Sequence, residues 1–294
     1  MQRRKVFLLG VGVQKAGTTW LHDYLHGLPE SDFGFAKEYH TFDARFLEAY
    51  HTLQAKNLER LERVIRKKQK KGFWPSPALD RQLIDLSRLI MFCEQPQFYA
   101  DYFDRLWQEN PAVQLVGDIT PGYSLLEAEH FDTIRKLIES RGFELKVLLV
   151  MRDPVERCYS AVRSDWQHKT RKAPRPDLDV IEMLKERYAT PGFQGRTRYD
   201  RIISTLESEF SAEELYYGFY ETLFSLEESK RLLTFLGLPQ SRLPDFDRRV
   251  NTSRRTTEIP AEVAGEIRDF YREAYDFCMA RFGRDFITRI WPYA

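Results

Sequence analysis

Near its start the chain has a run of apolar residues that ends in a glycine-containing loop. Residues 6–13 read VFLLGVGV, the loop QKAG follows at residues 14–17, and TTWL at residues 18–21 starts a segment of helical character. A strand that passes through such a loop into a helix turns several backbone N–H groups, and the positive end of the helix dipole, toward one point. The pattern predicts an anion site where the strand meets the helix.

The position of the lysine separates this loop from the common nucleotide-binding loops. A P-loop requires Gly-x4-Gly-Lys-Ser/Thr. Gly12 and Gly17 have this separation, but Thr18 stands at the lysine position and Lys15 lies within the loop. The Rossmann fingerprint also fails, because Lys15 follows Gly10 and Gly12 where a third glycine is required. The loop can therefore bind a phosphate, but its lysine is directed at a different atom.

Three further segments carry chemistry. Residues 37–43 read KEYHTFD, residues 118–123 read DITPGY, and residues 147–160 form an apolar strand that ends at Arg152 and continues into a helix with Ser160. An arginine at the carboxyl end of a buried strand stands at the ligand edge of an open α/β sheet. Its planar guanidinium can bind a phosphate through two hydrogen bonds. The Asp-Pro pair after it suits the N-cap and first position of a helix.

Together these segments resemble a known enzyme family. Residues 14–21 resemble the 5′-phosphosulfate loop of sulfotransferases whose donor is 3′-phosphoadenosine 5′-phosphosulfate (PAPS), and residues 147–160 resemble their 3′-phosphate motif. Residues 37–43 and 118–123 are similar to the Lys-Glu-x-His-Phe-Phe-Asp and Thr-Pro-x-Tyr segments of the heparan-sulfate-type branch. The matches cover roughly residues 6–165, in the family's order. The resemblance implies a P-loop-NTPase-like sulfotransferase fold and in-line transfer of a sulfuryl group to an acceptor hydroxyl.

The resemblance also assigns residues to the donor. Lys15 would reach the oxygen that bridges phosphorus and sulfur, where charge develops as the S–O bond breaks. With the loop dipoles it would neutralise the leaving phosphate, so we expect no metal requirement and release of 3′-phosphoadenosine 5′-phosphate (PAP). A late loop is expected to close over the 3′-phosphate through Ser253, Arg254 and Arg255. The other residues expected to bind the donor are Gln14, Ala16, Gly17, Thr18, Thr19, Trp20, Arg152 and Ser160.

The acceptor hydroxyl must lose a proton as its oxygen attacks sulfur. The family's segment places the general base at Glu38, and His40 is the alternative, since other sulfotransferase branches use histidine. Thr41 departs from the family, which has an aromatic residue there. The expected acceptor is a carbohydrate or small-molecule hydroxyl, and the further residues expected to contact it are Lys37, Asp118, Thr120 and Tyr123.

Composition limits the partners and the compartment. The chain has 45 Lys and Arg against 44 Asp and Glu, so no global field would recruit nucleic acid or a membrane surface. Its three cysteines are widely separated, which fits a reducing compartment rather than a disulfide framework. No stretch approaches the roughly 18 apolar residues that a spanning helix needs. We expect a cytoplasmic protein without a membrane span or a nucleic-acid partner; the sequence carries no signal for an oligomeric state.

Apolar runs and helical patterns alternate along the chain. Strands are expected at residues 6–11, 114–117, 145–151 and 215–220, and helices at residues 177–188, 199–209, 226–236 and 261–282. This alternation predicts one α/β domain over residues 1–294, with a central parallel sheet flanked by helices. An insertion at about residues 40–112 looks helical and contains a basic run at residues 63–71, typical of a solvated helix face. Residues 169–176 are expected to form a basic loop.

Two other functions are open at this point. A P-loop kinase or nucleotidase could use Asp118, at the end of an apolar strand, to organise Mg²⁺, but the displaced lysine argues against it. A catalytically silent protein that binds adenosine bisphosphate is the non-enzymatic alternative. It would be expected to have lost Lys15 or Glu38, and the chain keeps both.

Overall fold

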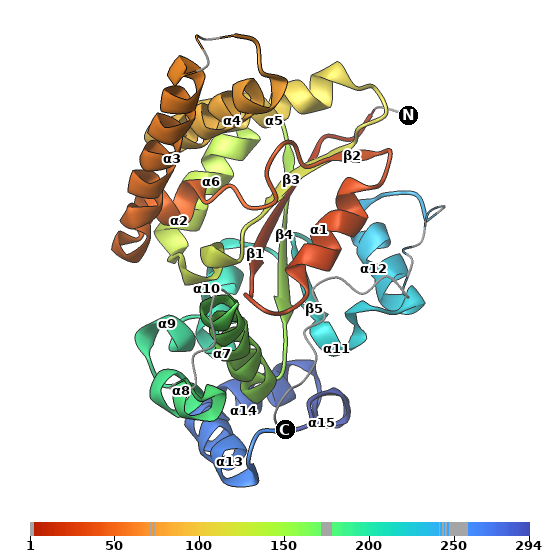
Figure 1. The fold of residues 1–294 in the computed structure, drawn as a ribbon. Coiled ribbons are helices and arrows are strands. Elements are labelled where there is room, and N and C mark those ends of the chain that lie inside the picture. Colours follow the sequence, from red (N-terminus) through yellow and green to blue (C-terminus); the bar gives the residue numbers. More distant parts are fainter. Residues whose placement is uncertain are drawn as a thin grey trace. The chain divides into compact units, whose positions relative to one another are not determined.

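The computed structural model describes residues 3–70, 72, 74–171, 178–240, 242, 244, 246 and 258–294. It contains a five-stranded sheet with the strand order β2-β3-β1-β4-β5 (Figure 1). The pairs β1–β3, β2–β3 and β4–β5 are parallel. The predicted α/β class, with a central sheet flanked by helices, is confirmed. The strands are β1 (Val6–Gly12), β2 (Ser31–Asp32), β3 (Leu115–Ile119), β4 (Glu144–Met151) and β5 (Leu215–Phe219).

Burial explains why four of these strands could be predicted. β1 and β3 are buried along their whole length, and β4 is buried except for Glu144. Such continuous apolar runs are typical of parallel strands that are covered on both faces. β2 was not predicted, because it has only two residues, both polar, and is defined by its pairing with Leu115 and Val116.

The chain divides into two compact units, and each is described separately. The first comprises residues Met1–Gly10 and Leu25–Lys146. Within it, α3 packs on α4, α4 on α5, and α5 on β3. These helices occupy most of the stretch for which a helical insertion is expected. The helical segments of this unit are α2 (Thr41–Phe46), η1 (Glu48–Tyr50), α3 (His51–Lys70), α4 (Pro77–Glu94), α5 (Pro96–Glu109), η2 (Pro121–Leu125) and α6 (Ala128–Glu139).

The second unit comprises residues Val11–Tyr24 and Val147–Ala294. It holds most of α1, the helix that follows the glycine loop, and α7, the helix that follows β4. Asp153 caps α7 and accepts hydrogen bonds from the backbone N–H groups of Val155 and Glu156, as the Asp-Pro pair predicts. The helices are α1 (Thr18–His26), α7 (Pro154–Thr170), α8 (Val180–Arg187), α9 (Pro191–Gln194), α10 (Tyr199–Glu209), α11 (Tyr220–Leu223), α12 (Leu226–Leu236), α13 (Ala261–Phe270), α14 (Arg272–Phe282) and α15 (Arg284–Ile290).

Some boundaries differ from the prediction. Lys169 and Thr170 belong to α7 rather than to a loop, because the Thr170 hydroxyl and backbone continue the helical bonding toward Trp166 and Gln167. Arg171 is the C-cap of α7, and residues 172–176, the rest of the predicted loop, lie outside the described residues. The single helix predicted over residues 261–282 is two helices that meet at Tyr271. No helix in the described part of the chain combines the length and apolar character that a membrane span requires.

Candidate functional site

The glycine loop of the second unit has the backbone of an anion site. Lys15 and Gly17 have positive φ values of 73° and 86°. A Cβ atom at Gly17 would lie 2.7 Å from Leu223 Cδ2, so only glycine fits this close approach to α11. Within the described chain, no backbone acceptor is recorded for the N–H groups of Thr18 and Thr19, in the first turn of α1. Free N–H groups at a helix start bind anions.

The side chains of the loop are held differently from one another. Gln14 is exposed and Ala16 is fully buried. Lys15 Nζ donates a hydrogen bond to Ser164 Oγ, on α7, at 2.7 Å. Trp20 is buried, and its ring stacks on Tyr24 with a centroid distance of 5.6 Å. The cation of the loop is thus held by α7, and the aromatic ring that follows the loop is held within α1.

Arg152 directly follows the last residue of β4, and one of its N–H groups has no partner among the described residues. Its side chain is only 13% exposed; Nη2 lies 3.0 Å from Glu156 Oε2, and Nη1 donates to the Lys15 carbonyl oxygen at 3.3 Å. The guanidinium lies 4.2 Å from the centre of the Tyr220 ring. Arg152 Nε is buried without a hydrogen-bond partner in the described structure. Buried donors are nearly always paired, so this N–H group is available to an anionic ligand. Arg157 Nε and Arg163 Nε, both on α7, are buried without a partner in the same way.

The other predicted donor residues are less well defined by contacts. Ser160 lies half-buried on α7, two turns from the Asp153 cap. Ser253, Arg254 and Arg255 lie outside the described residues.

Two carboxylates, the fully buried Asp153 and the half-buried Glu221, are linked to each other next to Arg152 in the chain. The Asp153 N–H group donates to Glu221 Oε1 at 3.0 Å, and Glu221 Oε2 accepts a bond from Trp291 Nε1 at 3.2 Å. Asp153 also accepts bonds from the Tyr275 hydroxyl and the Tyr293 N–H group, each at 3.1 Å. Burial raises the pKa of Asp153 to about 6 and that of Glu221 to about 7. Trp291 and Tyr293 of the C-terminal segment therefore fix Glu221 and Asp153, and Asp153 is the next residue in the chain after Arg152.

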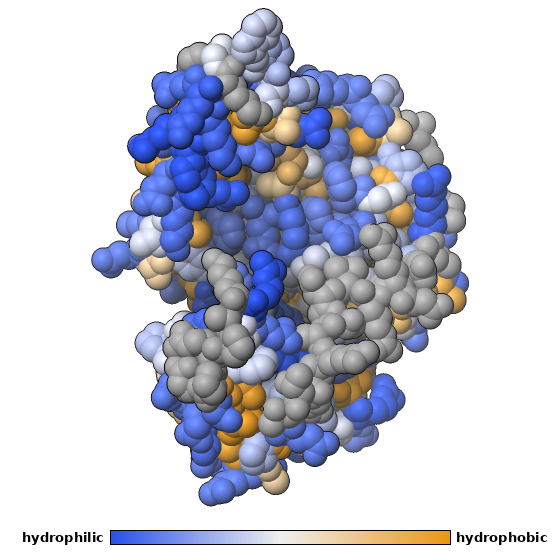
Figure 2. Space-filling view, viewed as in Figure 1, coloured by the Kyte–Doolittle hydropathy of each residue, from blue (hydrophilic) through white to orange (hydrophobic). Residues whose placement is uncertain are grey.

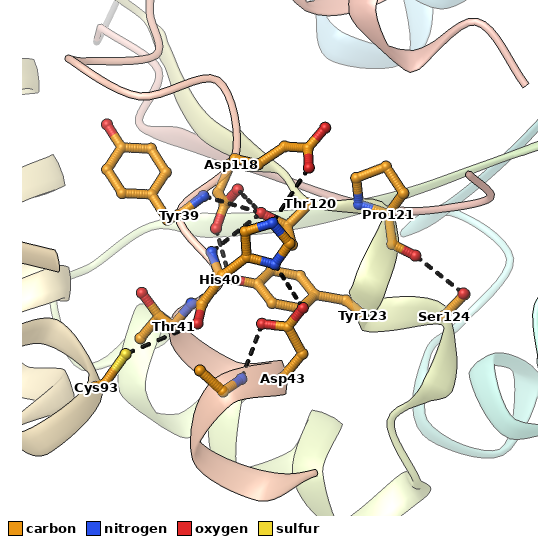
Figure 3. Close-up of polar contacts among 12 residues, drawn as sticks. Tyr39, His40, Thr41, Asp43, Cys93, Asp118, Thr120, Pro121, Tyr123 and Ser124 are labelled. Carbon is orange, nitrogen blue, oxygen red and sulfur yellow. Dashed lines mark hydrogen bonds and ion pairs between the residues drawn. The ribbon is translucent and has the colours of Figure 1, made fainter. Parts of the chain in front are cut away.

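In the first unit, Thr120 joins two segments that are distant in sequence (Figure 3). Its Oγ1 donates to Asp118 Oδ1 at 2.6 Å and accepts a bond from the Tyr39 N–H group at 3.0 Å. Asp118 Oδ2 accepts hydrogen bonds from the hydroxyls of Tyr123 (2.7 Å) and Tyr99 (3.0 Å). Asp118 is 1% exposed, and burial raises its pKa to about 6, although these hydrogen bonds oppose the rise. The network fixes the backbone between Tyr39 and His40 against the end of β3.

His40 lies between two carboxylates. Its Nδ1 is 2.7 Å from Asp43 Oδ2 and its Nε2 is 3.2 Å from Glu38 Oε2. Lys37 Nζ contacts the other Glu38 oxygen at 2.5 Å. His40 has a positive φ of 53°, uncommon for a residue other than glycine. Such local strain persists where the surrounding structure fixes it, as at binding sites.

These contacts set the charges. Burial lowers the pKa of His40, but hydrogen bonds to Asp43 and Glu38 outweigh it and raise the pKa to about 10. Burial raises the pKa of Glu38, but the hydrogen bond from His40 and the charge of Lys37 outweigh it and lower the pKa to about 2. At neutral pH, Glu38 is therefore a carboxylate and His40 an imidazolium.

The structure brings the predicted residues together within each unit. The glycine loop contacts Arg152 in the second unit, and Lys37, Glu38, His40, Asp118, Thr120 and Tyr123 form one network in the first. Four contributors were not predicted. Asp43 belongs to the segment at residues 37–43, and its spacing of three residues from His40 is the signal in the sequence that could have identified it. The sequence gives no sign of the roles of Ser164, Tyr99 and Tyr220, because these residues lie on helices α7, α5 and α11, away from the motifs in sequence.

No group of three or more His, Cys, Asp or Glu side chains within the described residues is placed to hold a metal ion. Asp118, the residue that could have organised Mg²⁺ in a kinase, has both oxygens engaged by hydroxyl groups.

The fold of the chain is similar to those of known proteins, and its sequence matches the model of a known family. A sulfotransferase of Alicyclobacillus acidocaldarius has a similar fold, with a TM-score of 0.57 and 17% identity over 95% of this chain and 96% of that one. A sulfotransferase domain from the curacin biosynthetic pathway has a TM-score of 0.49 and 17% identity over 88% of this chain and 82% of its own. No curated protein sequence matches the chain. The model of the Sulfotransferase family matches residues 8–242, most of the chain. The chain therefore belongs to the sulfotransferase family.

Proposed function

We propose that the protein transfers the sulfuryl group of PAPS to a hydroxyl of an acceptor, in line with the bond to the leaving phosphate. The observation that carries this proposal is the second unit's pair of anion-binding features. The glycine loop offers free N–H groups at the start of α1, and Arg152 offers a buried Nε without a partner. The hydrogen bond from Arg152 Nη1 to the Lys15 carbonyl oxygen joins them. PAPS carries two separate anionic groups, which such a pair suits.

Each donor residue then has a distinct role. The N–H groups and hydroxyls of Thr18 and Thr19 bind the 5′-phosphate. Arg152 and Ser160 bind the 3′-phosphate. Lys15 stabilises the charge that grows on the bridging oxygen, which makes its contribution larger in the transition state than in the ground state. The closing loop with Ser253, Arg254 and Arg255 stays a prediction, as does the heparan-sulfate-type branch.

The acceptor's proton goes to Glu38. As the acceptor oxygen forms its bond to sulfur, the S–O bond to phosphate breaks, its electron pair stays on the phosphate, and the hydroxyl proton moves to the base. His40 is protonated and has no lone pair to accept it, which favours Glu38 over His40. The low pKa of Glu38 depends partly on Lys37. If Lys37 turns to an anionic group of a bound substrate, Glu38 becomes more basic.

The extent of the enzyme and its setting are proposals as well. We expect residues 1–294 to form one sulfotransferase domain that acts in the cytoplasm without a metal. The acceptor is expected to be a carbohydrate or small-molecule hydroxyl. The kinase alternative gains no support, because the hydroxyls of Thr120, Tyr123 and Tyr99 occupy Asp118.

Transfer from labelled PAPS to a panel of hydroxyl compounds tests the function, with Lys15→Ala as the key variant. We expect this substitution to lower kcat by roughly 10²–10³-fold, as for loss of one group that stabilises developing charge, while PAP still binds and reports an intact fold. Phosphoryl transfer from ATP that depends on Mg²⁺, with no transfer from PAPS, would contradict the function.

A further inference from the structure

A cavity lies between α3 and α4 in the first unit, beside the segment that carries Glu38. Its volume is about 410 Å³. Phe35, Val64, Leu86 and Leu89 give it an apolar lining, and Ala36 lines it as well. Glu38 follows Ala36 by two residues, and two residues of extended chain span at most about 7 Å. The cavity is therefore next to the proposed general base within the same unit.

Three cations of α3 line this cavity. Arg60, Arg63 and Lys67 are spaced by three and four residues, which places them on one face of the helix. Within the described part of the chain, no carboxylate lies within ion-pair distance of any of the three; Arg63 Nε only donates a long bond to the Glu59 carbonyl oxygen, at 3.4 Å. One carboxylate, Asp85, lines the same cavity. The cavity thus has an excess of two positive charges.

Two other cations of α3 are paired, whereas Lys56 and Lys70, which do not line the cavity, have no ion-pair partner among the described residues. Arg66 pairs with Glu62 at 2.8 Å, and Lys68 pairs with Asp80 of α4. Figure 2 shows that strongly hydrophilic side chains gather over α3. What distinguishes Arg60, Arg63 and Lys67 is that their unpaired charges lie beside an apolar lining. This combination suits a ligand that is both anionic and apolar.

We propose that this cavity is the subsite that selects the acceptor, and that the acceptor carries a carboxylate, phosphate or sulfate group attached to an apolar body. The inference rests on the proposed sulfuryl transfer and narrows its acceptor class. Arg60, Arg63 and Lys67 bind the anionic group, and Phe35, Val64 and Leu86 enclose the apolar body. The hydroxyl to be sulfated then extends toward Glu38.

A matched pair of probes tests this subsite. Both 12-hydroxydodecanoate and 1,12-dodecanediol carry a hydroxyl at the end of the same carbon chain, and only the first has an anionic group. Calorimetry on the full chain in the presence of PAP should show binding of the hydroxy acid at least about ten-fold tighter than that of the diol. The double substitution Arg63→Gln with Lys67→Gln should remove this preference, because it removes two hydrogen-bonding charges from the cavity.

A control separates the local site from the general field of the helix. Arg66→Gln with Lys70→Gln removes the same number of charges from α3 but spares the cavity, so it should leave the preference unchanged. Equal weakening by both variants, or equal binding of the two probes by the native chain, would overturn the subsite. So would binding of anionic lipid vesicles that the cavity variant abolishes while the hydroxy acid does not bind, since the cations would then serve a membrane surface.

The two proposals fail in different ways. Binding of the hydroxy acid does not require turnover, so the cavity is tested even if PAPS is not the donor. With active enzyme, the cavity variant should raise KM for the hydroxy acid about ten-fold at unchanged kcat and unchanged affinity for PAP. If the native chain does not bind PAP but does bind the hydroxy acid more tightly than the diol, the result counts against the proposed sulfuryl transfer and not against the cavity.

Discussion

Glu38 and His40 belong to a row of four paired charges that also contains Lys37 and Asp43. The imidazolium of His40 donates to Asp43 on one side and to Glu38 on the other, and Lys37 contacts the remaining Glu38 oxygen. Asp43 is fully buried and holds the His40 ring on its buried side, while Glu38 stays partly exposed. This arrangement predicts a carboxylate base that is held in place, with histidine as its neighbour rather than its competitor.

Glu38→Gln should lower kcat by roughly 10²-fold or more, because the amide cannot take the acceptor's proton. Affinity for PAP should hardly change, since Glu38 acts on the acceptor's proton rather than on the phosphates of the donor. Steady-state kinetics and calorimetry measure the two effects. Activity that survives in Glu38→Gln and disappears in His40→Ala would instead make His40 the base.

The dependence of kcat/KM on pH gives an independent test. With Glu38 at a pKa of about 2 and His40 at about 10, the native enzyme should show a flat profile from about pH 5 to 9. His40→Asn removes the hydrogen bond that lowers the pKa of Glu38, so its acidic limb should move upward, toward the ordinary range of a glutamate. An acidic limb near pH 6.5 in the native enzyme, lost in His40→Asn, would identify histidine as the base.

The helix α7 carries residues of the proposed donor site, and its first turn is tied to the C-terminal segment. Its N-cap, Asp153, follows Arg152 directly, is fully buried, and accepts bonds from its own helix, from Tyr275 and from Tyr293. Asp179 caps α8 with the same two backbone contacts but is exposed. Burial of the first cap therefore joins the helix start to the C-terminal segment.

Asp153→Ala should destabilise the fold more than Asp179→Ala does. Loss of an exposed cap typically costs about 1 kcal/mol. Loss of the buried one also leaves the Tyr275 hydroxyl and the Tyr293 N–H group without an acceptor, for about 1–3 kcal/mol more. Thermal unfolding compares the two variants. Equal changes in Tm would mean that the C-terminal contacts add nothing to the cap.

Elements with a clear local pattern could be predicted, and elements that depend on distant partners could not. α10 and α12 begin and end where the helical pattern does. The break at Tyr271 could not be predicted, because the fully buried ring packs in the core and its hydroxyl bonds to the distant Tyr188 carbonyl oxygen. β2 exists only through its pairing with β3.

The same distinction holds for the candidate sites. Lys15 and Arg152 stand at strand ends, where the sequence itself indicates an anion site. Ser164 and Tyr220 contact them from α7 and α11, and Tyr99 reaches Asp118 from α5. A hydroxyl or ring on one face of a helix shows no sign of its partner in the sequence, so these contacts required the structure.

The chain as a whole has almost no net charge, with 45 cationic and 44 acidic residues. We therefore expect anions to be recognised by local groups rather than by a global field. The orphan Nε of Arg152 and the unpaired cations of α3 are two such places. The first is buried and should respond weakly to salt, whereas the second is exposed and screened.

Calorimetry of PAP and 5′-AMP with the native chain and with Arg152→Ala tests the donor site most directly. Recognition of the 3′-phosphate predicts that PAP binds much more tightly than 5′-AMP. Arg152→Ala should weaken the binding of PAP by about 1.5–3 kcal/mol, as for loss of hydrogen bonds to a charged group. The same substitution should leave the binding of 5′-AMP nearly unchanged. Equal affinity for the two nucleotides in the native chain would mean that the 3′-phosphate is not recognised, and would contradict PAPS as the donor.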